Sequence, residues 1–225
     1  MMCLPILSNI FGTIGDSNHR IQQYMIEKFK DIKGFLSEHE GSALSEYCEK
    51  FCIGGIAVEI GSYCGKSACY LGYACKKNNS KLFSVDHHHG SEEQQYGEEY
   101  FDEDIYDFDE KRVNTLPLFL ENISKFNLAA HIEPIIDTSE NASKLIQSDI
   151  DFVFIDGSHT FESARNDYAC WSPKIKEGGI LAIHDIYDTE MEGGQAPREI
   201  YLKALDEGYE LLKRVESLVI LQKLK

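Results

Sequence analysis

The chain has 225 residues, of which 43% are hydrophobic, and its formal net charge is −16 at pH 7. This length is enough for one α/β domain with a complete core. An acidic surface repels both nucleic-acid backbones and anionic membranes, so we expect neither as the main partner and favour a small molecule. The seven cysteines form no C-x-x-C pair. This pattern indicates reduced thiols in a cytoplasmic protein.

The first 52 residues are expected to be helical. The apolar start, 1–11, lacks a basic region and is too short to span a bilayer, so we expect no export signal and no membrane span. Apolar spacing of three and four predicts an amphipathic helix over 19–36. A second helix is expected with Ser42 as N-cap, ending before Gly54. These helices would pack on a core of 53–225 within a single domain, and would either cover a functional site or make a homodimer contact.

After residue 55 the sequence alternates between strand-like and helix-like segments. Strands are predicted at 56–60, 81–85, 132–136, 151–155 and 179–183. Alternation of this kind is typical of an α/β fold with a doubly wound, mostly parallel sheet and helices on both faces. The tail, 209–224, is expected to form a C-terminal antiparallel hairpin around Glu216 and Ser217.

The segment 58–68, with the sequence VEIGSYCGKSA, predicts a buried strand that turns at glycines into a helix. Gly61 allows a tight turn, Gly65 lets the next helix pack closely, and the first N–H groups of that helix can bind an anionic group. A dinucleotide fingerprint requires G-x-G-x-x-G, and Tyr63 replaces its second glycine. The turn therefore favours a nucleotide cofactor other than NAD. An NAD-dependent oxidoreductase stays open only if Tyr63 is tolerated beside a pyrophosphate.

This string resembles motif I of class I S-adenosylmethionine (SAM) dependent methyltransferases. The closest match is the E-x-G-x-Y-C-G-x-S-A version of the catechol O-methyltransferase-like group, in which Tyr63 and Cys64 are part of the pattern. The resemblance covers the chain from about residue 40 to the C-terminus. It implies a Rossmann-like methyltransferase fold and SAM as the cofactor.

The resemblance also implies which residues surround the cofactor. Asp86, at the end of the second strand, would bind the ribose, as a carboxylate at this position does in related folds. Glu59 and Ser67 would help to place the methionine portion, and Ser139 lies where the family contacts adenine. A purely structural role for Glu59 stays open, as does simple helix capping around Ser139. The expected cofactor site comprises Glu59, Gly61, Tyr63, Gly65, Ser67, Asp86, Ser139 and Asp156.

A candidate metal site follows from the ends of the fourth and fifth strands. Asp156, His184 and Asp185 offer two carboxylates and an imidazole on the edge that carries the cofactor turn. In catechol O-methyltransferase-like enzymes the Mg²⁺ ligands come from these two strand ends, as Asp and then Asp-Asn. The His-Asp pair of this chain departs from that pattern. It puts His184 in doubt as a ligand and leaves Mn²⁺, Fe²⁺ and Zn²⁺ open beside Mg²⁺.

His159 is the candidate catalytic base. It lies three residues after Asp156, where the resembling family has a lysine in that role. A histidine with an ordinary pKa of about 6.5 can take a proton from a hydroxyl near neutral pH, once a metal has lowered the pKa of that hydroxyl. Alternatively, His159 and His184 are structural histidines held by hydrogen bonds.

The acidic segment 86–110 contains eleven acidic residues, several aromatic residues and neither Lys nor Arg. It forms either a lid over the substrate or a solvated loop. The run His87-His88-His89 within it is not expected to be a metal cluster, because consecutive side chains in an extended loop diverge. A later loop, 188–197, is expected to border the substrate pocket.

Taken together, these patterns predict a SAM-dependent methyltransferase that carries out metal-assisted O-methylation of a small-molecule acceptor, with Mg²⁺ or Mn²⁺ as the candidate metals. The alternative is a SAM- or nucleotide-binding module that does not transfer a methyl group, since fold alone does not determine function.

Overall fold

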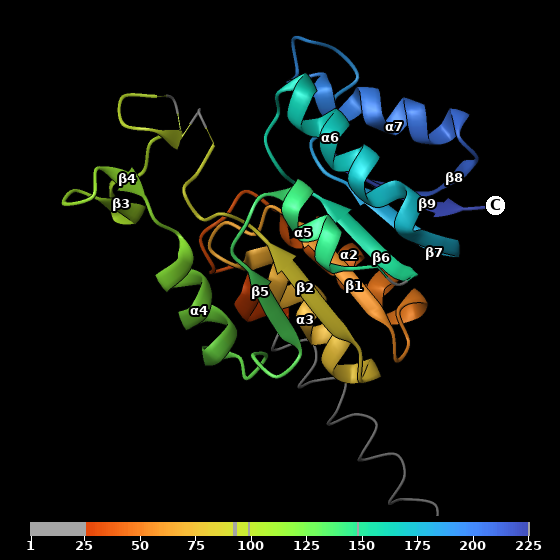
Figure 1. Cartoon of the computed structure of the whole chain (residues 1–225), viewed down its shortest axis with the longest axis horizontal. Helices are drawn as coiled ribbons and strands as arrows, with labels where there is room; N and C mark the ends of the chain where they lie inside the picture. Colours follow the sequence, from red (N-terminus) through yellow and green to blue (C-terminus); the bar gives the residue numbers. More distant parts are fainter. Residues whose placement is uncertain (1–25, 92–93, 99, 148, 225) are drawn as a thin grey trace, which may run out of the picture.

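The computed structural model describes residues 26–91, 94–98, 100–147 and 149–224 (Figure 1). The described helices are α2 (Glu38–Phe51), α3 (Lys66–Asn78), α4 (Leu116–Lys125), α5 (Ser139–Leu145), α6 (Phe161–Trp171) and α7 (Ala196–Asp206). The strands of the main sheet are β1 (Ile56–Ile60), β2 (Lys81–Val85), β5 (Ile132–Ile135), β6 (Ile150–Ile155), β7 (Ile175–Ile183), β8 (Tyr209–Val215) and β9 (Leu218–Lys223). A small hairpin is formed by β3 (Tyr106–Asp107) and β4 (Arg112–Val113).

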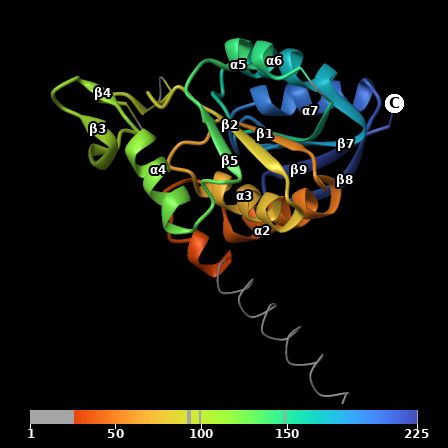
Figure 2. The same cartoon turned by 60° about the horizontal axis from the view of Figure 1, so that its bottom comes forward.

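The main sheet has seven strands in the order β5-β2-β1-β6-β7-β9-β8. The first five strands run parallel, whereas β9 is antiparallel to both β7 and β8. Figure 2 shows the three layers, with α5, α6 and α7 on one face of the sheet and α2 and α3 on the other. The predicted doubly wound sheet and its C-terminal hairpin are confirmed.

The central strands are apolar because both of their faces are covered. Every residue of β6 is buried, and Phe152 and Phe154 point into one core while Val153 and Ile155 point into the other. Strands of parallel sheets covered by helices on both sides characteristically read as such continuous apolar runs. The sheet therefore separates two hydrophobic cores, one for each helical layer.

The N-terminal region differs from the predicted helix over 19–36. Residues before 26 lie outside the described part of the chain, and only 26–29 are helical before the chain turns. Phe29 is buried between the rings of Tyr70 and Phe126, at centroid distances of 5.2 and 4.9 Å. Ile32 and Leu36 remain buried although the helix has ended. The apolar residues at this spacing are therefore buried partly by a helix and partly by the turn that follows it.

The prediction that Ser42 caps the second helix is wrong. Ser37 is the N-cap of α2, and it forms a capping box with Glu40, in which each side chain accepts the other residue's backbone N–H. Gly41 is needed inside the helix, because a Cβ at this position would lie 2.3 Å from the ring of Tyr70. The S-x-x-E signal of the capping box was visible in the sequence and preceded the apolar pattern that we used.

The described N-terminal part packs into the same core as the sheet. Leu44 and Cys48 of α2 belong to one hydrophobic cluster with Ala57 of β1 and Phe152 of β6. All six described cysteines are free thiols, and Trp171 is fully buried. These contacts join the described N-terminal part to the sheet, and the single domain stays a prediction.

One carboxyl group lies inside this core. Glu59 of β1 is completely buried, and its Oε2 accepts a hydrogen bond of 2.6 Å from the hydroxyl of Ser84, whereas its Oε1 has no hydrogen-bond partner. Burial raises the pKa of Glu59 to about 8, against the hydrogen bonds of Ser67 and Ser84, which lower it. The folded protein therefore holds a neutral carboxyl group near pH 7.

We predict that Glu59→Gln becomes more stabilising as the pH rises. Between the ordinary pKa of 4.5 and the folded value of about 8, the unfolded chain is ionised while the folded chain keeps its proton. The wild type therefore loses stability as the pH rises through this window, by at most ~1.4 kcal/mol per pH unit. Urea unfolding at about pH 5 and about pH 8 measures the change, with Glu133→Gln, at an exposed position of β5, as control. A stability difference that does not vary with pH would contradict the raised pKa.

Candidate functional site

A cavity of about 1330 Å³ opens at the carboxyl ends of the parallel strands. This is where ligands bind in open α/β sheets, and the volume exceeds the roughly 300–1,000 Å³ usual for one small ligand. The cavity therefore has room for a cofactor and a second molecule. Its lining includes most of the predicted site residues: Gly61, Tyr63, Ser67, Asp86, Ser139, Asp156, His159, His184 and Asp185.

The glycine turn after β1 brings two strand ends together. Gly61 has φ of +83°, and a Cβ at this position would lie 2.0 Å from the carbonyl oxygen of Asp156. Only glycine permits both the backbone conformation and this approach. Tyr63 follows with φ of 47°, and Gly65 precedes α3. The turn thus leads directly into the N-terminus of a helix, as the sequence predicts.

Asp86 is held across this turn by backbone N–H groups. Its Oδ2 accepts hydrogen bonds from the N–H groups of Ser62 and Tyr63, at 2.9 and 2.8 Å, and its Oδ1 accepts one from His88 at 2.7 Å. These bonds fix the carboxylate at the edge of the cavity. Oδ2 thus uses both of its lone pairs, whereas Oδ1 keeps one that a hydroxyl group of a ligand can use.

The other predicted cofactor residues divide into two groups. Ser67 and Ser139 line the cavity, and the hydroxyl of Ser139 accepts a hydrogen bond of 2.8 Å from the indole of Trp171. Glu59 and Gly65 are absent from the described lining, since Glu59 lies in the core and Gly65 packs against Phe119. These two residues shape the turn from behind.

Asp156, His184 and Asp185 converge at the ends of β6 and β7. One ligand atom of each lies within 4.8 Å of those of the other two. The Nδ1 atom of His184 is 3.1 Å from Oδ1 of Asp156 and 3.3 Å from Oδ2 of Asp185. Asp185 adopts a left-handed backbone conformation, with φ of 57°. Such strain in a residue other than glycine is typical of functional sites.

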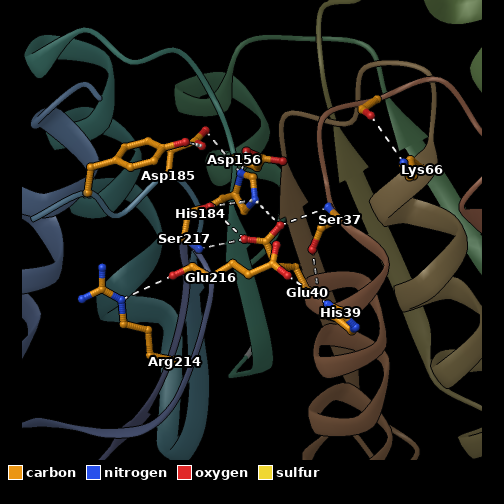
Figure 3. Close-up of polar contacts among 12 residues, drawn as sticks. Ser37, His39, Glu40, Lys66, Asp156, His184, Asp185, Arg214, Glu216 and Ser217 are labelled. Carbon is orange, nitrogen blue, oxygen red and sulfur yellow. Dashed lines mark hydrogen bonds and ion pairs between the residues drawn. The ribbon is translucent and has the colours of Figure 1, made fainter. Parts of the chain in front are cut away.

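His184 is buried, and its two ring nitrogens have different surroundings (Figure 3). Nε2 lies 3.1 Å from a carboxylate oxygen of Glu40, whereas Nδ1 has no hydrogen-bond partner despite its two neighbouring carboxylates. Burial opposes a charged imidazole, but Asp156, Asp185 and Glu40 outweigh it and raise the pKa of His184 well above its usual value.

These residues fit a divalent cation. Two carboxylates and an imidazole are a common donor set for one, and the unpartnered Nδ1 of His184 faces both carboxylates. No Lys or Arg side chain forms a described ion pair with Asp156 or Asp185. A bound cation would balance their charge.

His159 contacts this group through Asp185. Its Nε2 is 2.8 Å from Oδ2 of Asp185, whose Oδ1 accepts a hydrogen bond of 3.1 Å from the hydroxyl of Tyr187. Burial opposes ionisation of Asp185, but His159 and His184 hold its pKa well below the usual range. His159 is half-exposed at the cavity, so a ligand can reach its ring.

Sequence reasoning missed the part of the site that comes from α2 and from the β8–β9 hairpin. Glu40 of α2 lines the cavity, as do Arg214, Glu216 and Ser217 of the β8–β9 hairpin. The capping box was the one signal that could have drawn attention to Glu40. Nothing local in the sequence indicates that it meets His184, which is 144 residues away.

The acidic segment is anchored beside the cavity. Lys33 forms ion pairs of 2.6 Å with Asp102 and 2.8 Å with Asp104. Tyr100 lines the cavity and contacts Phe35, with 5.9 Å between the ring centroids. Residues of the loop 188–197 also line the cavity, as predicted: Asp188, Glu192, Gly193, Gly194 and Pro197.

Among the three consecutive histidines, the rings of His87 and His89 stack at a centroid distance of 5.8 Å, whereas His88 lies apart from them. His87 lines the cavity, while His88 is buried with its Nδ1 atom 2.7 Å from the hydroxyl of Thr115. His89 lies beside Arg112, outside the described lining.

Within the described residues, the second group of potential metal ligands is a buried set of thiols between α2 and α3, Cys48, Cys52 and Cys75. No described helix is both long and apolar enough to cross a bilayer.

Solved methyltransferases share this architecture. The chain is similar to the O-methyltransferase TomG from Streptomyces achromogenes, solved with SAM, at 11% identity and a TM-score of 0.60, covering 85% of this chain and 82% of that one. It is also similar to the SAH-bound methyltransferase PaMTH1 from Podospora anserina, at 12% identity and a TM-score of 0.61, covering 100% and 99%. An rRNA methylase from Streptococcus thermophilus matches at 16% identity and a TM-score of 0.53, covering 80% and 94%.

A family model described as a methyltransferase domain matches residues 58–186. The match begins in β1, includes the glycine turn and Asp86, and ends just after His184 and Asp185. It covers more than half of the chain and contains all the site residues at the ends of the parallel strands β1, β2, β6 and β7. The chain therefore belongs to this methyltransferase family, and its fold is that of the class I SAM-dependent enzymes.

Proposed function

We propose that this protein transfers a methyl group from SAM to a hydroxyl oxygen of a small acceptor, with the help of a divalent cation. One observation carries the proposal: the glycine turn with Asp86 and the group Asp156, His184 and Asp185 open on the same cavity. A methyl donor and a cation-bound acceptor could therefore lie side by side. SAM itself supplies the reactive methyl group.

The cofactor half of the cavity is assigned to the glycine turn. Asp86 accepts a ribose hydroxyl with the lone pair of Oδ1 that its three backbone hydrogen bonds leave available. Ser67 stands at the start of α3 near the methionine portion, and Ser139 at the start of α5 near adenine. Gly61 and Tyr63 also line this half of the cavity, and Glu59 and Gly65 support the turn without lining it.

The acceptor half is assigned to Asp156, His184, Asp185 and His159. The first three residues would hold the cation, which lowers the pKa of an acceptor hydroxyl by acting as a Lewis acid. His159 then takes the proton from that hydroxyl. Asp185, 2.8 Å from Nε2 of His159, would stabilise the ring once it has taken up this proton.

The charge of the cavity restricts the acceptor. Apart from histidines, the described lining has Arg214 as its one basic side chain, against carboxylates from every side. Arg214 is itself paired with Asp188 at 3.0 Å. An anionic acceptor, including a nucleic-acid strand, would be repelled. We therefore infer a neutral or cationic small molecule that carries a hydroxyl group, and this argues against an rRNA substrate despite the likeness to an rRNA methylase.

The alternative is a module that binds SAM without transferring its methyl group. Such a module needs the cofactor half alone. The observation against it is the second half of the cavity, which is lined by Asp185, in a left-handed backbone conformation, and by the buried His184. Strain and burial of polar groups lower the stability of the fold, so residues kept in such states are expected to act on a ligand.

Asp86→Ala is expected to weaken binding of S-adenosylhomocysteine at least tenfold. A hydrogen bond to a charged group contributes about 1.5–3 kcal/mol, and the variant removes the proposed ribose acceptor. Calorimetric titration measures the affinity, and Glu133→Ala, which removes an exposed carboxylate from β5, is the control. Unchanged binding in the Asp86 variant would rule out the proposed orientation of the cofactor.

His159→Gln is expected to lower the methyl-transfer rate by about 10²–10⁴, because the acceptor proton then lacks a base. Affinity for S-adenosylhomocysteine should stay the same, since His159 lies in the acceptor half. The rate is measured as release of S-adenosylhomocysteine with an acceptor selected from a panel of catechols and hydroxylated amines. A variant with the wild-type rate would remove His159 from the reaction.

Chelation of divalent cations is expected to abolish transfer with the same acceptor, while leaving binding of S-adenosylhomocysteine intact. Adding back a divalent cation should restore the rate. Full activity in the presence of a chelator would show that the enzyme works without a cation. The cluster of Asp156, His184 and Asp185 would then need another explanation.

A further inference from the structure

Glu40 is a buried carboxylate that lies outside the residues matched by the family model. It is 3% exposed, although it is charged and has no Lys or Arg beside it among the described ion pairs. Its Oε1 accepts hydrogen bonds from the N–H and the hydroxyl of Ser217, at 3.0 and 2.8 Å. Its Oε2 accepts one from the N–H of Ser37 at 3.0 Å and lies 3.1 Å from Nε2 of His184. Burial of a carboxylate is costly without such partners.

The contact with Glu40 determines which nitrogen of His184 can bind a ligand. Because an ionised carboxylate only accepts hydrogen bonds, the nitrogen facing it must carry the proton. When a cation replaces a proton of the ring, it must be the proton on Nδ1, and the lone pair of that atom then faces the cation. That atom is buried, lacks a hydrogen-bond partner and faces Asp156 and Asp185 at 3.1 and 3.3 Å. Metal-bound histidines usually donate their other N–H to a carboxylate or carbonyl in this way.

We propose that Glu40 is a positioning residue that holds His184 as the Nε2-protonated tautomer. Nδ1 then joins Asp156 and Asp185 in a mixed nitrogen and oxygen site that prefers a first-row transition cation, such as Co²⁺, Fe²⁺ or Zn²⁺, to Mg²⁺. Imidazole suits these cations, whereas Mg²⁺ selects oxygen ligands in an octahedral arrangement. This inference rests on the proposed cation-assisted function and specifies the class of cation at that site.

A second element of the structure supports the assignment. Glu40 is fixed from both ends of the chain, by the first turn of α2 and by the turn between β8 and β9, and Figure 3 shows it between Ser217 and the ring of His184. A carboxylate that served the helix alone would need the bond to Ser37 and no more. The three remaining contacts, two with Ser217 and one with His184, all orient the carboxylate toward the site.

The test must separate this role from helix capping. Glu40→Gln keeps the size of the side chain but loses the charge that selects the tautomer. Ser37→Ala breaks the same capping box and leaves the contact between Glu40 and His184 in place, so it is the matched control. His184→Asn replaces the ring with an amide and removes the proposed nitrogen ligand.

Co²⁺ is titrated into each full-length protein with S-adenosylhomocysteine bound and followed by visible absorption, and Mg²⁺ is added as a competitor. We expect the wild type to bind Co²⁺ more tightly than Mg²⁺ by roughly tenfold or more. Glu40→Gln should weaken Co²⁺ binding by about 10–100-fold, the usual cost of losing such a partner. His184→Asn should reduce the preference for Co²⁺ over Mg²⁺. Ser37→Ala should lower the unfolding temperature without changing Co²⁺ affinity.

Several results would overturn the inference. Equal losses of Co²⁺ affinity in Glu40→Gln and Ser37→Ala would show that Glu40 acts only through the helix. A wild-type protein that prefers Mg²⁺ would refute the class of cation while leaving the proposed function intact. Sulfur-to-cobalt charge-transfer absorption that survives in His184→Asn would place the ion on Cys48, Cys52 and Cys75 instead. If the wild type binds S-adenosylhomocysteine but no divalent cation, the cation-assisted function itself fails.

Discussion

The register of the four central parallel strands decides where the chemistry of this protein lies. Ile60 pairs with both Val85 and Ile155, and Ile155 pairs with Ile183, so β2, β1, β6 and β7 end side by side. The residues that directly follow these four strands are therefore neighbours. Gly61, Asp86, Asp156 and His184 are these four residues, and all of them line the cavity. A shift of one residue in any strand would turn its side chains to the opposite face and dismantle the site.

The electrostatics of the cavity follow from this concentration of strand ends. Asp86 accepts hydrogen bonds from backbone N–H groups, which is the usual arrangement for an anion beside a turn that leads into a helix. Asp156 and Asp185 have His184 between them, and Glu40 contacts the far side of its ring. Three carboxylates around one imidazole leave an excess of negative charge even when the ring is protonated. Under the proposed function, this excess would attract both the cation and a cationic acceptor.

The N-terminal turn and the acidic segment enclose the cavity from the side where the sheet provides no cover. Lys33 ties 102–104 to the chain before α2, and Phe35 contacts both Tyr63 and Tyr100. The cofactor turn, the N-terminal part and the acidic segment thus meet at one aromatic patch. Phe35 and Tyr100 remain exposed at the surface of this patch. These contacts are compatible with the segment acting as a lid, which stays a prediction.

The sequence by itself determined the features that depend on neighbours in the chain. Alternating apolar runs, the glycines around Tyr63 and the acids that follow buried strands were enough to predict the sheet, the cofactor turn and the strand-end residues of the cavity, because each is a local pattern with a period or a spacing. The end of the first helix could not be read in this way, since Ile32 and Leu36 are buried by tertiary contacts and keep a helical spacing without a helix. Only the tertiary structure decided that Glu40 meets His184 and Ser217. That contact joins three segments far apart in the chain, and its physical basis is packing and burial of charge, which no local pattern records.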